Sequence, residues 1–163
     1  MAEWGNVLRR AARIGLDLLS GRNRSAPAGP ARSGVRTVSS ADRADRIVYA
    51  PRPDGAADPG EIVWAWVPFE EGDGRGKDRP LLVVGRRGGE LAGLMLSSRD
   101  RAGDRDWVSI GSGAWDRQGR ESFVRLDRVV EMAEDAVRRE GAVLDRPRFD
   151  RVATELRTRF HWR

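Results

Sequence analysis

The stretch GEIVWAWVPFEEGDGRGKDRPLLVV, residues 60–84, contains two apolar runs separated by a loop rich in glycine and charge. The first run is apolar at every position of residues 62–67, and Pro68 follows it. A run that is apolar on both faces and is stopped by proline is typical of a buried strand. Residues 81–84 form the second run and predict a second strand.

Further short strands are predicted on the C-terminal side of this stretch, over residues 91–96 and 107–110, with a longer element over residues 123–130. Glycines separate them, and no long helical pattern lies between them. Short strands at close intervals favour a mostly antiparallel barrel. A shorter helical turn is predicted over residues 134–140, ended by Gly141. A final helix is predicted after Asp145, which can cap it, with Pro147 in its first turn.

Two further segments precede this domain, which we assign to residues 58–163. Residues 1–20 include WGNVLRRAARIGLDLL, whose spacing predicts an amphipathic basic helix. Its basic face suits weak contact with an anionic membrane surface or a partner protein; the alternative is a helix that packs on its own domain. Residues 21–57 are rich in Ser, Gly, Pro, Ala and Arg, and predict a disordered linker with an extended lead-in to the domain.

Composition excludes several kinds of site. The chain has no cysteine and one histidine, His161, near its end, which excludes thiolate zinc sites and makes a histidine-rich metal site or a Ser/His/Asp triad implausible. We therefore expect no metal and no cofactor, and chemistry by arginine, hydroxyl and carboxylate groups. No run of about 18 apolar residues is present, and arginines interrupt the stretch where a secretory signal would be apolar. We expect a cytoplasmic protein.

The net charge of +5 is concentrated near the N-terminus, because residues 1–57 hold 10 arginines against 5 acidic residues. The rest of the chain is balanced. Binding of nucleic acid by the barrel must therefore depend on the local placement of charge.

The loop of residues 70–80, EEGDGRGKDRP, lacks both the first glycine and the Ser or Thr that a Walker A phosphate loop needs. It does carry Arg75, Lys77 and Arg79. Arg79 lies at the start of one predicted strand, and Ser97 and Ser98 follow another. If these strands are neighbours, a guanidinium and a hydroxyl converge, which suits a phosphodiester. The alternative is a surface arginine and a turn serine.

Aromatic and charged residues elsewhere allow two interpretations. Trp64, Trp66 and Trp107 lie in apolar strands and are expected in the core, although tryptophan can also stack on unpaired bases. Trp115 lies in the loop of residues 111–120 and is predicted to be exposed for RNA binding, with Arg117 and Arg120 as phosphate contacts. Residues 98–106, SRDRAGDRD, are expected to form a solvated loop.

Residues 60–84 resemble the opening of the PemK/MazF-like toxin family, in which a strand begins with Gly-Asp or Gly-Glu and a Gly-rich loop leads to a strand beginning with Arg-Pro. The resemblance continues through LMLSS (94–98), WVSI (107–110), SFVRLDRVVEM (122–132) and a terminal helix preceded by Leu144 and Asp145. It covers about 100 residues in the same order, within residues 58–163. Residues 1–57 lie outside it.

The resemblance implies an SH3-like barrel with a C-terminal helix, a homodimer, and a metal-independent endoribonuclease that cleaves single-stranded RNA to leave a 2′,3′-cyclic phosphate. It implies an antitoxin partner. By position, Arg79 matches the catalytic arginine of the family and Ser97 the Thr or Ser that assists it. The alternative function is a catalytically inactive barrel that acts as a nucleic-acid or protein interaction module.

Overall fold

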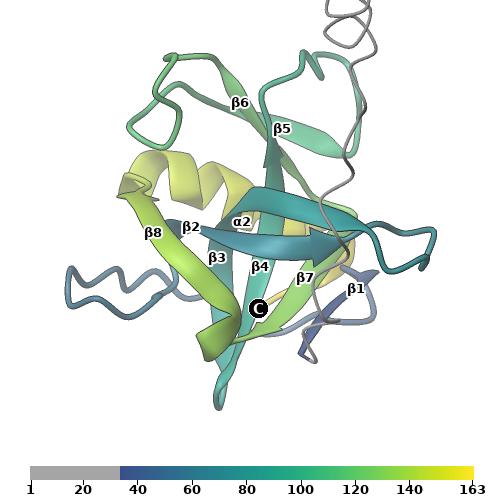
Figure 1. Cartoon of the computed structure of the whole chain (residues 1–163). Helices are drawn as coiled ribbons and strands as arrows, with labels where there is room; N and C mark the ends of the chain where they lie inside the picture. The colour runs from purple at the N-terminus through teal and green to yellow at the C-terminus, as the bar shows by residue number, and fades with distance from the viewer. Residues whose placement is uncertain (1–33) are drawn as a thin grey trace, which may run out of the picture.

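The computed structural model describes residues 34–163, without the side chains of residues 139 and 140. The predicted helix over residues 1–20 and residues 21–33 of the predicted linker lie outside the described residues. The elements are β1 Val35–Ser39, β2 Glu61–Pro68, β3 Gly76–Arg87, β4 Glu90–Ser97, β5 Trp107–Gly111, β6 Ser122–Arg125, β7 Arg128–Ala133, the 3-10 turn η1 Glu134–Ala136, β8 Val137–Val143 and α2 Arg146–Phe160 (Figure 1).

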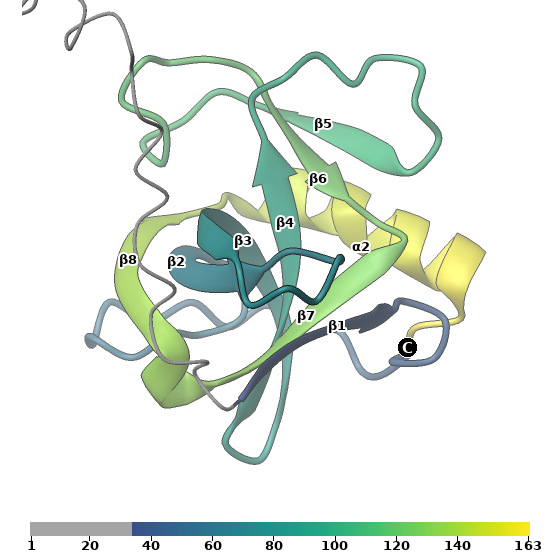
Figure 2. The ribbon, with the colours of Figure 1, turned by 45° about the vertical axis from the view of Figure 1, so that its right-hand side comes forward.

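The strands form an antiparallel sheet that curls on itself. The order along its main path is β1-β7-β4-β3-β2-β8, and β6 pairs with both β4 and β5 off this path. β1, at one end of the path, also contacts β2 near the other end. In both views the curled sheet has α2 packed against one side (Figure 1, Figure 2). The predicted mostly β barrel with a C-terminal helix is therefore confirmed.

Both faces of the central strands are buried, which explains why their sequences are apolar without alternation. Ile62 belongs to the core cluster that also contains the apolar side of α2, and its neighbour Val63 belongs to a second cluster on the other face of β2. Phe149, Val152 and Leu156 supply the contacts from α2, and all are at most 2% exposed.

The C-terminal helix begins where the sequence predicts. The Asp145 side chain accepts a hydrogen bond from the backbone N–H of Arg148, and proline lies in the first turn. This cap satisfies an N–H group that has no partner within the helix. The helix ends at Phe160, and His161, which caps it, has left-handed backbone angles and an exposed side chain. No helix in the described part of the chain has the length and apolarity that a membrane span requires.

Two details of the predicted secondary structure are wrong. Residues 123–130 form parts of two strands, β6 and β7, because the chain leaves the ladder between them and the Leu126 N–H donates to the Asp106 carbonyl. Residues 134–140 form η1 and most of β8 in place of a helical turn. Pairing with β2 overrides their helical propensity. A Cβ on Gly141 would lie 2.9 Å from the Ile62 carbonyl oxygen, so this glycine permits the close pairing.

The predicted disordered linker is wrong over residues 34–46, which form β1 and pack against the barrel. We call residues 34–57, which include the predicted lead-in, the N-terminal segment. β1 pairs with β7, and Val35 lies opposite Met132. Ile47 is buried in the core, and the buried Ser40 hydroxyl donates to the Leu126 carbonyl. The low apolar content of this segment is a poor guide, because a few buried residues are enough to anchor it to the sheet, along which it lies (Figure 2).

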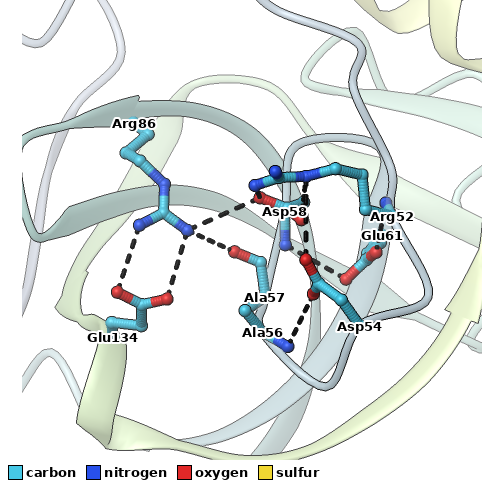
Figure 3. A network of polar contacts seen from close by, with 8 residues as sticks. All are labelled: Arg52, Asp54, Ala56, Ala57, Asp58, Glu61, Arg86 and Glu134. Carbon is cyan, nitrogen blue, oxygen red and sulfur yellow. Dashed lines mark hydrogen bonds and ion pairs between the residues drawn. The ribbon is translucent and has the colours of Figure 1, made fainter.

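A network of charged groups fixes the last part of this segment (Figure 3). Arg52 contacts the buried carboxylate of Asp58 through Nε at 3.1 Å and Nη2 at 3.2 Å. The backbone N–H of Arg52 donates to Glu61 at the start of β2. Arg86 of β3 donates to the Ala57 carbonyl at 2.7 Å and pairs with Glu134. These contacts tie the segment to β2, β3 and η1.

Candidate functional site

An open cavity of about 680 Å³ lies where β3 and β4 meet the β5–β6 pair, and Arg79 and Ser97 both line it. In Figure 1 the β5–β6 pair stands beyond the tip of β4, where Ser97 is the last residue. Both side chains are half-buried, so each belongs to a fixed wall and still reaches solvent. The structure thus brings together the arginine and the hydroxyl that the sequence placed at two strand ends. We call this space the first cavity.

The strand register explains this proximity. Leu81 of β3 pairs with Met95 of β4. Because the strands are antiparallel, two residues toward the cavity from this pair lead to Arg79 on one strand and to Ser97 on the other. Positions two apart on a strand share a face, so both side chains continue the face on which Leu81 and Met95 lie.

The first cavity is strongly basic although the barrel as a whole is not. Its basic lining residues are Lys77, Arg79, Arg99, Arg101, Arg117, Arg120 and Arg125, against Asp78 and Asp116 as the acidic ones. A cleft lined by one sign of charge attracts ligands of the opposite sign. The local placement of charge therefore favours an anionic ligand.

Arg79 differs from the cations around it. No described carboxylate lies within ion-pair distance of its guanidinium, whereas Arg125 is 2.8 Å from Asp127 and 3.3 Å from Glu70. Burial, together with the charges of Arg125 and Arg99, lowers the pKa of Arg79, although Glu70 acts in the opposite direction. A half-buried guanidinium among other cations is stabilised when an anion binds.

The serines present their hydroxyls at the same place. Ser97 Oγ accepts a hydrogen bond from the backbone N–H of Arg99 at 3.1 Å, which leaves its own proton available to a ligand. Ser98 is exposed and lines the first cavity as well. Guanidinium and hydroxyl groups together can hold the oxygens of one phosphate.

The remaining predicted cations divide between two cavities. Lys77, Arg117 and Arg120 line the first cavity, and Arg75 does not. Arg120 donates to Asp116 at 2.8 Å, and this hydrogen bond lowers the pKa of Asp116. Asp116 is consequently a weak proton acceptor.

Arg75 lines a second cavity of about 400 Å³, which shares Arg79, Met95 and Arg125 with the first. Two carboxylates of the β2–β3 loop that could accept a proton, Glu70 and Glu71, line this second cavity. Asp78 lines the first cavity, and Arg138 contacts both of its oxygens at 2.9 and 2.7 Å.

The tryptophans differ in exposure from the prediction, although Trp115 does line the first cavity. Trp115 is only 7% exposed, and its Nε1 donates to the Ser122 hydroxyl at 3.0 Å, so the prediction of an exposed stacking residue is wrong. Its ring folds over Gly113, where a Cβ would lie 2.2 Å from it. Trp64 and Trp107, expected in the core, are half-buried and line the first cavity; Trp66 is also half-buried.

Sequence reasoning missed three arginines of the first cavity. Arg99 and Arg101 belong to the stretch that was interpreted as a solvated loop, and Arg125 to a predicted strand. The Arg101 guanidinium stacks 4.7 Å from the centre of the Trp107 ring. The only sequence signal for Arg99 and Arg101 is the alternation of charge in the segment between two predicted strands. This signal indicates a binding site only when the loop is known to lie beside β4.

Comparison with known proteins assigns this architecture to a family. The model of a family described as the PemK-like, MazF-like toxin of type II toxin–antitoxin systems matches residues 58–160. The chain belongs to this toxin family. In this MazF-like toxin the match runs from just before β2 to the end of α2, and it includes every described strand except β1.

Solved structures show the same fold. Two crystal forms of MazE–MazF from Deinococcus radiodurans match this MazF-like toxin with TM-scores of 0.50 and 0.51 at 21% and 18% identity. The alignments cover 64% and 66% of this chain and 96% and 99% of the other chain. No curated protein matches the chain. Across residues 34–163, no group of three or more His, Cys, Asp or Glu residues is arranged to hold a metal ion.

Proposed function

We propose that this toxin is an endoribonuclease that cleaves single-stranded RNA and leaves a 2′,3′-cyclic phosphate. The observation that carries the proposal is Arg79, a half-buried guanidinium without a carboxylate partner in the described chain, which lines one open, basic cavity together with Ser97. Such a group is suited to stabilise charge that develops on a phosphate. Family membership supports the same activity.

The reaction uses a nucleophile that RNA itself carries. The 2′-hydroxyl oxygen attacks the adjacent phosphorus, and the bond from phosphorus to the 5′ oxygen of the next nucleotide breaks. The 2′ proton passes to solvent or to a carboxylate that lines the first cavity, for which Asp78 is a candidate. The departing 5′ oxygen takes up a proton and becomes a hydroxyl.

Within this reaction Arg79 stabilises charge and does not transfer a proton, because a guanidinium stays protonated in proteins. Its planar donors match two phosphate oxygens at once. Ser97 donates a hydrogen bond to a non-bridging oxygen or to the 2′-hydroxyl. Lys77, Arg117 and Ser98 bind the neighbouring phosphates.

We further propose that the first cavity also receives an acidic segment of an antitoxin, and that the toxin is a homodimer in the cytoplasm. The solved MazF structures from Deinococcus radiodurans contain MazE. A basic groove is complementary to an acidic peptide as well as to RNA, so a bound antitoxin would block the substrate. Light scattering of the free chain measures the oligomeric state directly.

The test is cleavage of a single-stranded oligoribonucleotide in the presence of EDTA, with the 3′ ends of the products analysed by mass. We expect cyclic phosphate ends from the wild type. We expect Arg79→Ala to lower kcat by about 10² to 10³, as loss of one preorganised donor does, and Ser97→Ala to lower it as well. Arg151→Ala, on the exposed side of α2, is the control and should match the wild type.

Retention of full activity by folded Arg79→Ala would contradict the proposed site. A wild type that binds RNA in this assay but never cleaves it would contradict the proposed reaction and favour the interaction module.

A further inference from the structure

β1 supplies one wall of the second cavity. Thr37, in the middle of β1, lines this cavity together with Phe69 and Glu71 of the β2–β3 loop. The family match begins at residue 58. The barrel common to the family therefore contributes most of this cavity, and the N-terminal segment of this chain completes it.

The position of Thr37 follows from the pairing of β1. Val35 packs against the core cluster that contains Val67 and Met95, two residues that also line the second cavity. Thr37 lies two residues further along β1 and therefore on the same face. It is half-buried and pairs with Val130 of β7. The β1–β7 ladder thus fixes the side chain in the cavity wall.

The second cavity continues the proposed active site. Arg79, Met95 and Arg125 line both cavities. A phosphate held by Arg79 would leave its neighbouring nucleotide at the second cavity, whose volume of about 400 Å³ lies within the range usual for small-ligand sites. Phe69 offers an aromatic ring to an unstacked base.

The cavity is lined by Arg75, Arg79 and Arg125 as well as by two carboxylates, and it is the carboxylate of Glu71 that favours a base with an exocyclic amino group. The exposed carboxylate of Glu71 has no ion-pair partner within residues 34–163, whereas the second carboxylate, Glu70, is paired with Arg125. Carboxylates accept hydrogen bonds from base amino groups, which cytosine, adenine and guanine carry and uracil lacks. The Thr37 hydroxyl can donate to a ring nitrogen or carbonyl of the same base.

We propose that the second cavity is a base-binding subsite in which Thr37 and Glu71 select an amino-bearing base next to the cleaved bond. This subsite adds selectivity for a base to the proposed nuclease function, and it rests on that function. The N-terminal segment is then part of the substrate site in addition to stabilising the barrel.

The experiment compares oligoribonucleotides that differ only in the nucleotide on each side of the cleaved bond. At one of these two positions we expect the wild type to prefer A, C or G over U in kcat/KM by about tenfold, the discrimination typical of a base contact. Thr37→Val, which keeps shape, and Glu71→Gln, which removes the charge, should each reduce this preference. Thr158→Val, on the exposed side of α2, is the matched control and should leave it intact.

The outcomes separate the two proposals. If the wild type cleaves, Arg79→Ala does not, and both Thr37→Val and Glu71→Gln keep the wild-type base preference, then the subsite is refuted and the nuclease stands. If the wild type cleaves none of the oligonucleotides, both are refuted. If Thr37→Val does not fold, Glu71→Gln alone tests the subsite, because Glu71 lies in an exposed loop.

Discussion

The choice of arginine at position 79 has a physical reason. Burial and the neighbouring guanidiniums of Arg125 and Arg99 lower the pKa of any cation at this position. An arginine keeps its proton despite this, because its ordinary pKa lies far above neutral pH. A lysine starts lower and is a compact point charge without the two-pronged geometry that matches phosphate.

Arg79→Lys therefore tests both properties. We expect a lower kcat at neutral pH from loss of the paired donors. We also expect activity to fall as the pH rises, at a lower pH than for the wild type, because the same surroundings lower the pKa of the lysine and the protonated form is lost above it. The measurement is kcat against pH for both proteins. Parallel profiles of equal height would contradict this account.

The candidate site was predictable from strand ends but not from loops. The β3–β4 ladder ends at Leu81 and Met95, two residues before Arg79 and Ser97, so their proximity follows once these strands are neighbours. Arg79 itself pairs with Ala65 of β2, and Ser97 pairs with Phe123 of β6. Trp115 was misplaced because the direction of a side chain in a loop depends on tertiary contacts, here a hydrogen bond to Ser122 and a glycine beneath the ring.

Among the elements, the β2–β3 hairpin depends most on one glycine. A Cβ at Gly76 would lie 2.4 Å from the Val67 carbonyl oxygen and 2.6 Å from the Trp66 ring. The hairpin carries Arg75 at one end and Arg79 a few residues further along. The close packing at Gly76 therefore fixes the position of the hairpin residues that line the two cavities.

We expect Gly76→Ala to destabilise the protein by about 1–3 kcal/mol, the usual cost of inserting a methyl group where there is no room. Cleavage should decline too, because the hairpin must shift. Gly89→Ala is the control, since a Cβ there meets nothing within 4 Å. Urea unfolding measures both variants, and equal midpoints would refute the packing argument.

Elements whose own sequence marks their start or their apolar pattern were predicted. The two strands that depend on a distant partner for their formation, β1 and β8, were not. Asp145 and Pro147 mark the start of α2 in the sequence itself. Residues 134–140 read as helical in isolation, and become mostly strand only because β2 offers them an edge. β1 was missed for the same reason: its partner, β7, lies far along the chain.

For the whole molecule, the N-terminal segment and the barrel share a buried ion-pair cluster. Arg43, only 3% exposed, lies 2.5 Å from Glu131 of β7, 2.8 Å from Asp45 and 3.5 Å from Glu90. Glu131 is 5% exposed and also pairs with Arg36, which is 70% exposed. The cluster joins a segment outside the family match to the sheet within it.

Arg43→Ala should destabilise the protein by about 3–5 kcal/mol, because it leaves the carboxylate of Glu131 buried without its main partner. Arg36→Ala is a matched control, since it removes an exposed partner of the same carboxylate and should cost at most about 1 kcal/mol. The free energies of unfolding in urea give both values. Equal, small losses would show that the N-terminal segment is only loosely attached.

The proposed cleavage depends on Arg79 and Ser97 acting on the same phosphate. A double-mutant cycle on oligoribonucleotide cleavage by wild type, Arg79→Lys, Ser97→Ala and the double variant tests this most directly. Residues that act as a unit give strongly non-additive losses. We predict that the double variant loses little more activity than the worse single variant. Losses in kcat that simply multiply would contradict a shared phosphate.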